Sequence, residues 1–116
     1  IIEKAKNGED ILVPKNQFAA PTSAKELAKF IIYIMETTEY GIYHAVCQGS
    51  CSRKEFAEKI FEFKGLEANV IETEEIVDAS FRPDYSVLDD FVLRISGNYE
   101  MPHWEKALEE YINTIK

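Results

Sequence analysis

The sequence has little glycine, cysteine and histidine, from which many cofactor and metal sites are built. Its 116 residues include five glycines, two cysteines and two histidines. The glycines stand far apart, so the glycine-rich loop that cradles the phosphates of a dinucleotide is missing. No apolar run approaches the roughly 20 residues that a membrane-spanning helix needs. These absences argue against a dinucleotide loop and against a membrane span within this stretch.

Cysteine is too scarce for the disulfide framework of a secreted domain. Cys47 and Cys51 are the two cysteines, and their C-x-x-x-C spacing lacks the partner ligands of a zinc site. We expect them to be reduced thiols in the core or in a loop rather than reactive groups. The sequence therefore favours a cytoplasmic protein with no metal bound to this segment.

Basic residues are outnumbered by acidic ones, 13 against 21, which gives a net charge of −8 at pH 7. Nucleic acids and anionic membranes bind basic surfaces, so neither is expected as a partner. Hydrophobic residues make up 46% and charged residues 29%, which is typical of a folded globular protein rather than a disordered one. We expect residues 1–116 to form a single domain.

Two capping patterns mark the main helices. Ser23 with Glu26 and Ser52 with Glu55 have the form of a capping box, in which each side chain bonds the other residue's free backbone N–H. The first helix is expected over 23–36, and its wide apolar stripe suits packing on a sheet. Further helices are expected at 53–64, around 91–95 and from 104 onward, with Tyr111 on the inward face. Residues 1–6 look like the end of a helix, so we expect the chain to be a fragment.

Short runs of strand-forming residues alternate with these helices: Ile11–Val13, Ile42–Val46, Ala68–Ile71 and Tyr85–Leu88. The run 42–46 is expected to form a buried strand beside the first main helix. Residues 15–21 are expected to be an irregular loop. The alternation of strand and helix predicts an α/β fold.

Arg82 is the strongest candidate for a ligand contact. It lies in an expected loop next to Pro83, just before a strand, and such loops gather ligand contacts. A guanidinium also matches the oxygens of a phosphate with two parallel hydrogen bonds. The alternative is an ion pair with a nearby acid, Asp78 or Asp84. The other two arginines lie in helical patterns, where a surface role is sufficient.

Four sequence blocks follow one another over nearly the whole chain: V-P-K-N-Q-F-A-A-P-T-S-A-K-E-L-A at 13–28, Y-G-I-Y-H-A-V at 40–46 with G-S-C-S at 49–52 and E-F-A at 55–57, R-P-D-Y-S-V-L-D at 82–89, and M-P-H-W-E-K-A-L at 101–108. Together they resemble the motifs of the dTDP-4-dehydrorhamnose reductases, a family of extended short-chain dehydrogenases/reductases. The sequence differs from the family pattern at Asn16, at Ala19-Ala20 and at Arg53-Lys54, where an aromatic pair is usual.

The resemblance implies an enzyme that reduces the 4-keto group of dTDP-6-deoxy-L-lyxo-4-hexulose with NADPH or NADH and forms dTDP-L-rhamnose. In that family an N-terminal Rossmann domain holds the cofactor and carries a catalytic Tyr-x-x-x-Lys pair. These 116 residues contain neither the pair nor the glycine-rich loop. The resemblance therefore implies that this chain is the C-terminal, sugar-nucleotide-binding part of such an enzyme and that the Rossmann domain is missing from it. It also implies that the chain has no catalytic residues, binds no cofactor and is inactive by itself.

The resemblance also points to a substrate site. Related reductases and epimerases place an arginine in the region of Arg82 on the diphosphate, so we expect Arg82 to contact the diphosphate of a dTDP-sugar. The loop containing Lys15, Gln17, Phe18 and Ala19 is expected beside the nucleotide. Two alternatives stay open: another nucleotide-sugar enzyme of this class, such as an epimerase or dehydratase, and a non-catalytic regulatory relative. The oligomeric state is open as well, a homodimer included.

Overall fold

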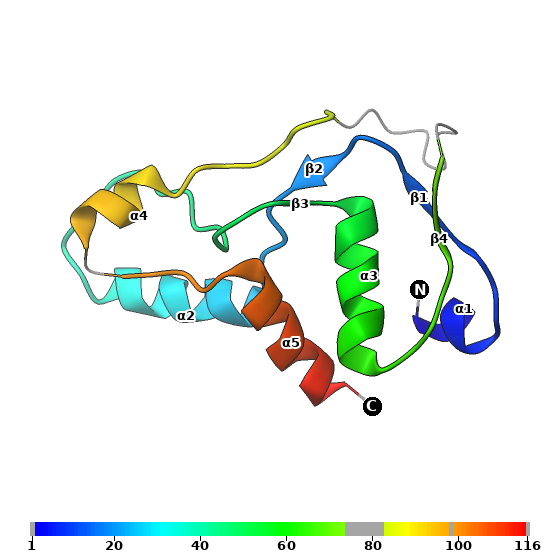
Figure 1. Cartoon of the computed structure of the whole chain (residues 1–116). Helices are drawn as coiled ribbons and strands as arrows, with labels where there is room; N and C mark the ends of the chain where they lie inside the picture. The colour runs from blue at the N-terminus through cyan, green and yellow to red at the C-terminus, as the bar shows by residue number, and fades with distance from the viewer. Residues whose placement is uncertain (1, 74–82, 98, 116) are drawn as a thin grey trace.

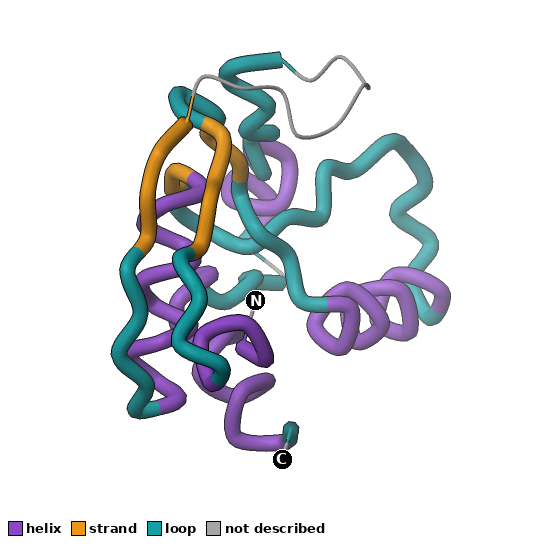
Figure 2. Tube along the Cα trace, turned by 90° about the vertical axis from the view of Figure 1, so that its right-hand side faces the viewer, coloured by secondary structure: helices purple, strands orange, loops and turns teal. Residues whose placement is uncertain are grey.

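A pair of parallel strands with a helix packed against it forms one end of the molecule (Figure 1). The structure is a computed structural model that describes residues 2–73, 83–97 and 99–115. β1 (Ile11–Pro14) pairs in parallel with β4 (Val70–Thr73), with Ile11 opposite Val70. Figure 2 shows the two strands side by side. The short helix α1 (Ile2–Lys6) precedes them. The mixed α/β class predicted from the sequence is confirmed.

α3 (Arg53–Lys64) links the two halves of the fold, and it begins and ends where the sequence predicts. The Ser52 hydroxyl oxygen accepts a hydrogen bond from the amide N–H of Glu55 at 3.1 Å. Gly65 ends the helix in the left-handed conformation, at a φ of 70°. α3 packs against β1 and β4 on one side and against α5 (Trp104–Thr114) on another. The core is built mainly from these elements: Ala5, Ile11, Val13, Cys51, Ala57, Ile60, Phe61, Met101, Trp104, Ala107, Leu108 and Ile112.

A second strand pair lies inside the segment that was predicted to be an irregular loop. β2 (Phe18–Ala19) pairs antiparallel with β3 (Cys51–Ser52), with Phe18 opposite Ser52. The prediction for 15–21 is therefore wrong at these two residues. Two residues are too few for an alternating pattern, and the partner strand lies far along the chain, so no local signal marks this pairing.

α2 (Ala24–Met35) begins after the predicted capping residue, Ser23, whose hydroxyl oxygen accepts from the amide N–H of Glu26 at 3.4 Å. Phe30 is only 4% exposed. Its ring packs against the rings of Tyr43 and Tyr99, with centroids 6.0 and 5.3 Å apart. α2 is therefore held by aromatic contacts to loop segments.

The prediction that α2 packs on a sheet beside a strand over 42–46 is wrong. Ile42 is 86% exposed, and residues 42–46 form no strand. A strand needs a neighbour for its backbone N–H and C=O groups, and none of the strands in 2–73, 83–97 and 99–115 lies beside this run. The apolar stripe of α2 is correspondingly open, with Ile31, Ile32 and Met35 exposed by 46%, 62% and 77%.

Three smaller predictions also need correction. The strand expected over Tyr85–Leu88 is a single bridge between Tyr85 and Phe18. The strand expected over Ala68–Ile71 lies two residues further on, as β4. Tyr111, expected on the buried face of α5, is 58% exposed.

The molecule is elongated and thin, with extents of 51 × 32 × 20 Å. Its Cα radius of gyration is 16.3 Å, whereas a compact domain of this length has one of roughly 13 Å. α2 and α4 (Phe91–Ser96) lie at the end opposite to β1 and β4 (Figure 1). Phe30 joins α2 to the core, whereas Ile31, Ile32 and Met35 stay exposed.

Candidate functional site

The loop with the predicted site residues is held between two segments from distant parts of the chain. On one side, β2 pairs with β3, and the Arg53 N–H donates to the Gln17 carbonyl oxygen at 3.2 Å. On the other side, the Phe18 N–H donates to the Asp84 carbonyl oxygen at 2.7 Å, and the Ser86 N–H donates to the Phe18 carbonyl oxygen at 2.9 Å. The segment that follows Arg82 is thus fixed directly against the loop at 15–19.

A small pocket of about 100 Å³ opens where these segments meet. Its described lining residues come from the loop, from the start of α3 and from the 83–86 segment: Gln17, Phe18, Ala19, Arg53, Pro83 and Ser86. Three of the predicted site residues therefore line one pocket. Polar groups from Gln17, Arg53 and Ser86 surround it, so it suits a polar or anionic part of a ligand.

The other two predicted site residues are placed differently. Lys15 does not belong to the described lining of this pocket; its N–H donates to the Thr73 carbonyl oxygen at 3.0 Å, at the end of β1 and β4. Arg82 lies outside the described residues. Pro83, the next residue in the sequence, lines the pocket, and the contact expected of Arg82 stays a prediction.

Phe18 and Tyr85 form an exposed aromatic pair beside the pocket. Their ring centroids are 6.4 Å apart, and the planes are tilted by 38°. The two residues are 37% and 65% exposed. Rings that keep one face open can bind a flat, partly apolar group such as a nucleobase. Tyr85 is a candidate that the sequence did not single out, because only its bridge to Phe18 brings it beside the pocket.

Asn16 shapes the loop. Its φ of 59° lies in the left-handed region, and it is the described residue other than glycine with a positive φ. Asparagine tolerates this conformation better than most residues with a side chain. Asn16 thereby turns the chain from β1 into β2. The sequence marked Asn16 only as a difference from the family pattern.

A second hollow lies on the far side of the 83–90 segment. It measures about 540 Å³ and lies between residues 46–50, residues 85–90 and α4. Arg94 lines it, and its guanidinium is already paired with Asp89 at 2.9 Å and with Asp90 at 3.5 Å. The surface role predicted for Arg94 is confirmed, because its carboxylate partners neutralise it.

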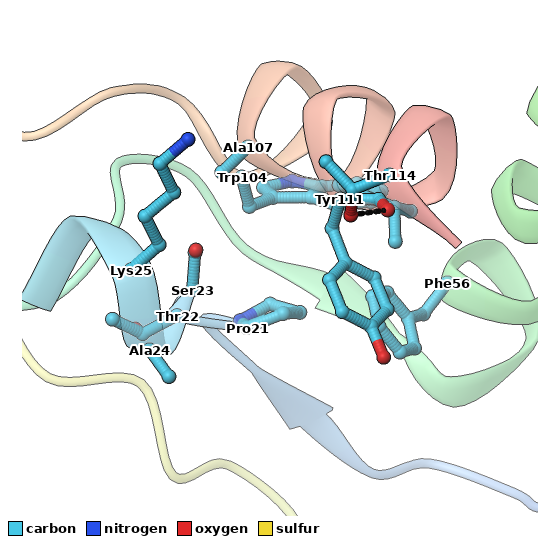
Figure 3. Close-up of a pocket in the computed structure, with 11 residues that line it drawn as sticks. Pro21, Thr22, Ser23, Ala24, Lys25, Phe56, Trp104, Ala107, Tyr111 and Thr114 are labelled. Atoms are coloured by element: carbon cyan, nitrogen blue, oxygen red, sulfur yellow. Dashed lines mark hydrogen bonds between the residues drawn. The ribbon is translucent and has the colours of Figure 1, made fainter.

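A third pocket is mainly apolar and lies away from all the predicted site residues. It measures about 430 Å³. Figure 3 shows Trp104 and Tyr111 reaching into it from α5, Phe56 from α3 and Pro21 from the loop that precedes α2. The surface of this pocket is mainly apolar, although the side chains of Ser23, Lys25 and Tyr111 also line it.

Neither cysteine has the surroundings of a nucleophile. Cys47 and Cys51 are 1% and 4% exposed, and both are free thiols. Burial raises the pKa of Cys51 to about 11, and it also raises the pKa of Cys47. Both thiols are therefore protonated at neutral pH, as expected for core cysteines. Among the residues that the structure describes, no three His, Cys, Asp or Glu side chains gather closely enough to hold a metal ion.

No helix in the described part of the chain has the length and the apolar character needed to cross a membrane.

Comparison with known proteins assigns the chain to one family. The family model described as "RmlD substrate binding domain" matches residues 1–116, so the chain belongs to that family. The resemblance noted in the sequence is thereby confirmed.

Individual relatives agree with this assignment. The spore coat polysaccharide biosynthesis protein SpsK of Bacillus subtilis is 35% identical over 97% of this chain, which covers 40% of SpsK. The structure of the dTDP-4-dehydrorhamnose reductase of Bacillus anthracis in complex with NADP is similar with a TM-score of 0.89 at 40% identity, over 97% of this chain and 41% of that one. The Clostridium acetobutylicum dTDP-4-dehydrorhamnose reductase gives a TM-score of 0.88 at 32% identity, with the same two coverages. The chain therefore spans about two fifths of the relatives that it matches.

Proposed function

We propose that this chain is the sugar-nucleotide-binding part of a dTDP-4-dehydrorhamnose reductase. The parent enzyme reduces dTDP-6-deoxy-L-lyxo-4-hexulose to dTDP-L-rhamnose with NADPH or NADH, in the cytoplasm. Residues 1–116 form one substrate-binding domain, and the cofactor and the catalytic Tyr-x-x-x-Lys pair belong to a domain outside them. The family assignment over 1–116 and the reductases among the similar structures support this proposal.

The observation that carries the proposal is the pair of hydrogen bonds on either side of Phe18. They fix the predicted loop at 15–19 against residues 84–86, which are far away in the sequence and closely follow Arg82 along the chain. A ligand at the small pocket then touches both the loop and Pro83, the residue that follows Arg82 in the sequence.

The residues of the chain divide the binding task according to their chemistry. The Phe18 and Tyr85 rings offer an apolar surface for the thymine base. The Gln17 amide and the Ser86 hydroxyl offer hydrogen bonds, and Arg82 binds the diphosphate. Binding at these points orients the sugar toward the cofactor domain, where hydride transfer takes place. The chain binds and orients the substrate, and by itself it is inactive.

Arg82 gives the direct test. We expect Arg82→Ala in the full-length enzyme to weaken dTDP binding by about 10- to 150-fold, because a charge-assisted bidentate contact contributes roughly 1.5–3 kcal/mol. Arg82→Lys should also weaken binding, since it keeps the charge but loses the planar fork. Titration calorimetry with dTDP measures both effects. An unchanged dissociation constant in a folded Arg82→Ala enzyme would leave Arg82 as a surface ion-pair residue.

The reaction is tested separately. The full-length protein is expected to oxidise NADPH or NADH in the presence of the 4-keto sugar nucleotide, and the isolated chain is expected not to. A full-length protein that binds dTDP but turns over no keto-sugar nucleotide would instead be a regulatory relative. Turnover by the isolated chain at the rate of the full enzyme would contradict the division of roles between the two domains.

A further inference from the structure

We propose that Arg53 is a second anion-binding residue of this site and that it contacts the diphosphate of the bound dTDP-sugar. This inference rests on the proposed function and adds to it a residue that determines affinity for the charged part of the substrate.

The backbone of Arg53 is fixed beside the loop at 15–19. Arg53 follows Ser52, which lies opposite Phe18 in the β2–β3 pair. The Arg53 N–H then donates to the Gln17 carbonyl oxygen at 3.2 Å. Because the backbone is held at both residues, the Arg53 side chain starts from a defined position at the pocket, and it contributes to the pocket lining.

None of the described carboxylates pairs with the guanidinium of Arg53. In the part of the chain that the structure describes, the Arg53 guanidinium has no carboxylate within 4 Å, whereas Arg94 pairs with two aspartates. Lys29, Lys54 and Lys59 pair with glutamates as well. In a chain of net charge −8, carboxylates are plentiful. An arginine that faces a pocket without one therefore leaves a local positive charge where an anion can bind.

The size and chemistry of the pocket indicate which part of the ligand it receives. Pockets that enclose a whole small ligand usually measure about 300–1,000 Å³, so a pocket of about 100 Å³ holds only a part. Arg53 is the charged residue of its described lining, and a guanidinium fits phosphate oxygens in a bidentate manner. The anionic part of a dTDP-sugar is its diphosphate. The thymine base can then bind at the exposed rings of Phe18 and Tyr85, next to the diphosphate.

Lys54 is a matched control for Arg53. It is the next residue of α3, so Lys54→Ala removes the same charge at nearly the same position. Its ammonium lies 3.9 Å from Glu58, and it does not belong to the described lining of the pocket. If Arg53 contacts the anion, Arg53→Ala should lower the affinity much more than Lys54→Ala does. If only the long-range charge matters, the two substitutions should lower the affinity by similar amounts.

The experiment measures calorimetric binding of dTDP, thymidine and inorganic pyrophosphate to the full-length protein. NADPH is kept in excess, so that the phosphate sites of the cofactor are filled. We expect Arg53→Ala to weaken the binding of dTDP and of pyrophosphate about 10-fold and to leave thymidine unchanged. Arg53→Lys should give an intermediate loss for dTDP, and Lys54→Ala should stay within about twofold of the wild type. Equal melting temperatures of the four proteins exclude a folding effect.

The outcomes separate this inference from the proposed function. Suppose that the wild type binds dTDP and that Arg53→Ala does not weaken this binding, or weakens it no more than Lys54→Ala does. Arg53 is then not a ligand contact, and the proposed function stands. If the wild type binds pyrophosphate in an Arg53-dependent manner but shows no preference for dTDP, the anion site stands and the proposed function fails. If the wild type binds neither compound, both are overturned.

Discussion

Gly49 occupies a position where a side chain would collide with a helix cap. Its φ is 83°, in the left-handed region, and a Cβ atom there would lie 3.0 Å from His103 Cδ2 and closer still to Nε2. His103 cannot easily move away. Its Nδ1 accepts from the Glu105 N–H at 3.3 Å and caps α5, and its backbone bridges to Gln48. The loop that leads into β3 and the cap of α5 are thus joined by this packing contact and by backbone hydrogen bonds between Gln48 and residues 102 and 104.

We expect Gly49→Ala to destabilise the protein by about 2 kcal/mol or more, since the strain of a positive φ adds to the collision. Gly97→Ala is the matched control. Gly97 has a φ of 67°, but no atom lies within 4 Å of an added Cβ. Gly97→Ala should therefore lower the free energy of unfolding by only about 1 kcal/mol. Urea unfolding of the two variants measures the difference. Equal losses would show that His103 yields to the new methyl group.

The pocket residues show which parts of the site a sequence can reveal. Gln17, Phe18 and Ala19 could be predicted because they lie within one recognisable motif. Arg53 could not, because it reaches the pocket only through the pairing of β2 with β3, and a helical pattern gave it a sufficient surface role. Tyr85 joins the site in the same way, through its bridge to Phe18. Residues that meet by long-range pairing leave no local signal.

The helices were predicted well because their ends are determined by neighbouring residues. At α3 the Ser52 hydroxyl accepts from the Glu55 N–H at 3.1 Å and donates to the Glu55 carboxylate at 3.2 Å. The strands were predicted less well. Residues 42–46 have the composition of a strand, but no strand in the described part of the chain pairs with them. Strand propensity mainly reflects packing against neighbouring strands. Composition alone cannot supply a strand partner.

We expect Ser52→Ala to cost about 1 kcal/mol, the usual loss when a capping hydroxyl is removed. Ser50→Ala is a suitable control, because Ser50 is an exposed serine in the same loop and caps no helix. Thermal unfolding monitored by circular dichroism compares the two. Since Ser52 also lies opposite Phe18, Ser52→Ala tests whether the start of α3 supports the loop at 15–19. Equal stability of the two variants would show that the cap contributes little here.

At the scale of the whole molecule, the apolar surface that α2 leaves open is the most prominent feature. We define the α2 face as Ile31, Ile32, Met35, Tyr40 and Ile42, which are between 46% and 90% exposed. Burying one large apolar side chain completely contributes about 1.5–3 kcal/mol. An apolar surface of several such side chains is usually an interaction site rather than free surface. The elongated shape, with a radius of gyration of 16.3 Å, agrees with a face that the described residues leave uncovered.

We expect the isolated 116-residue chain to self-associate through the α2 face, and we expect the full-length protein to cover this face. Replacing Ile32 and Met35 by Gln should make the isolated chain monomeric, because it removes the two most exposed aliphatic residues of α2. The same double substitution should destabilise the full-length protein, where those side chains are buried against the rest of the chain.

Leu12→Gln is the control, since Leu12 is 56% exposed on β1, away from α2. Sedimentation velocity over a range of concentrations and thermal unfolding measure the two effects. Two results together would contradict this prediction: the isolated wild-type chain stays monomeric at every concentration, and the double substitution does not change the stability of the full-length protein. The α2 face would then be ordinary solvent-exposed surface.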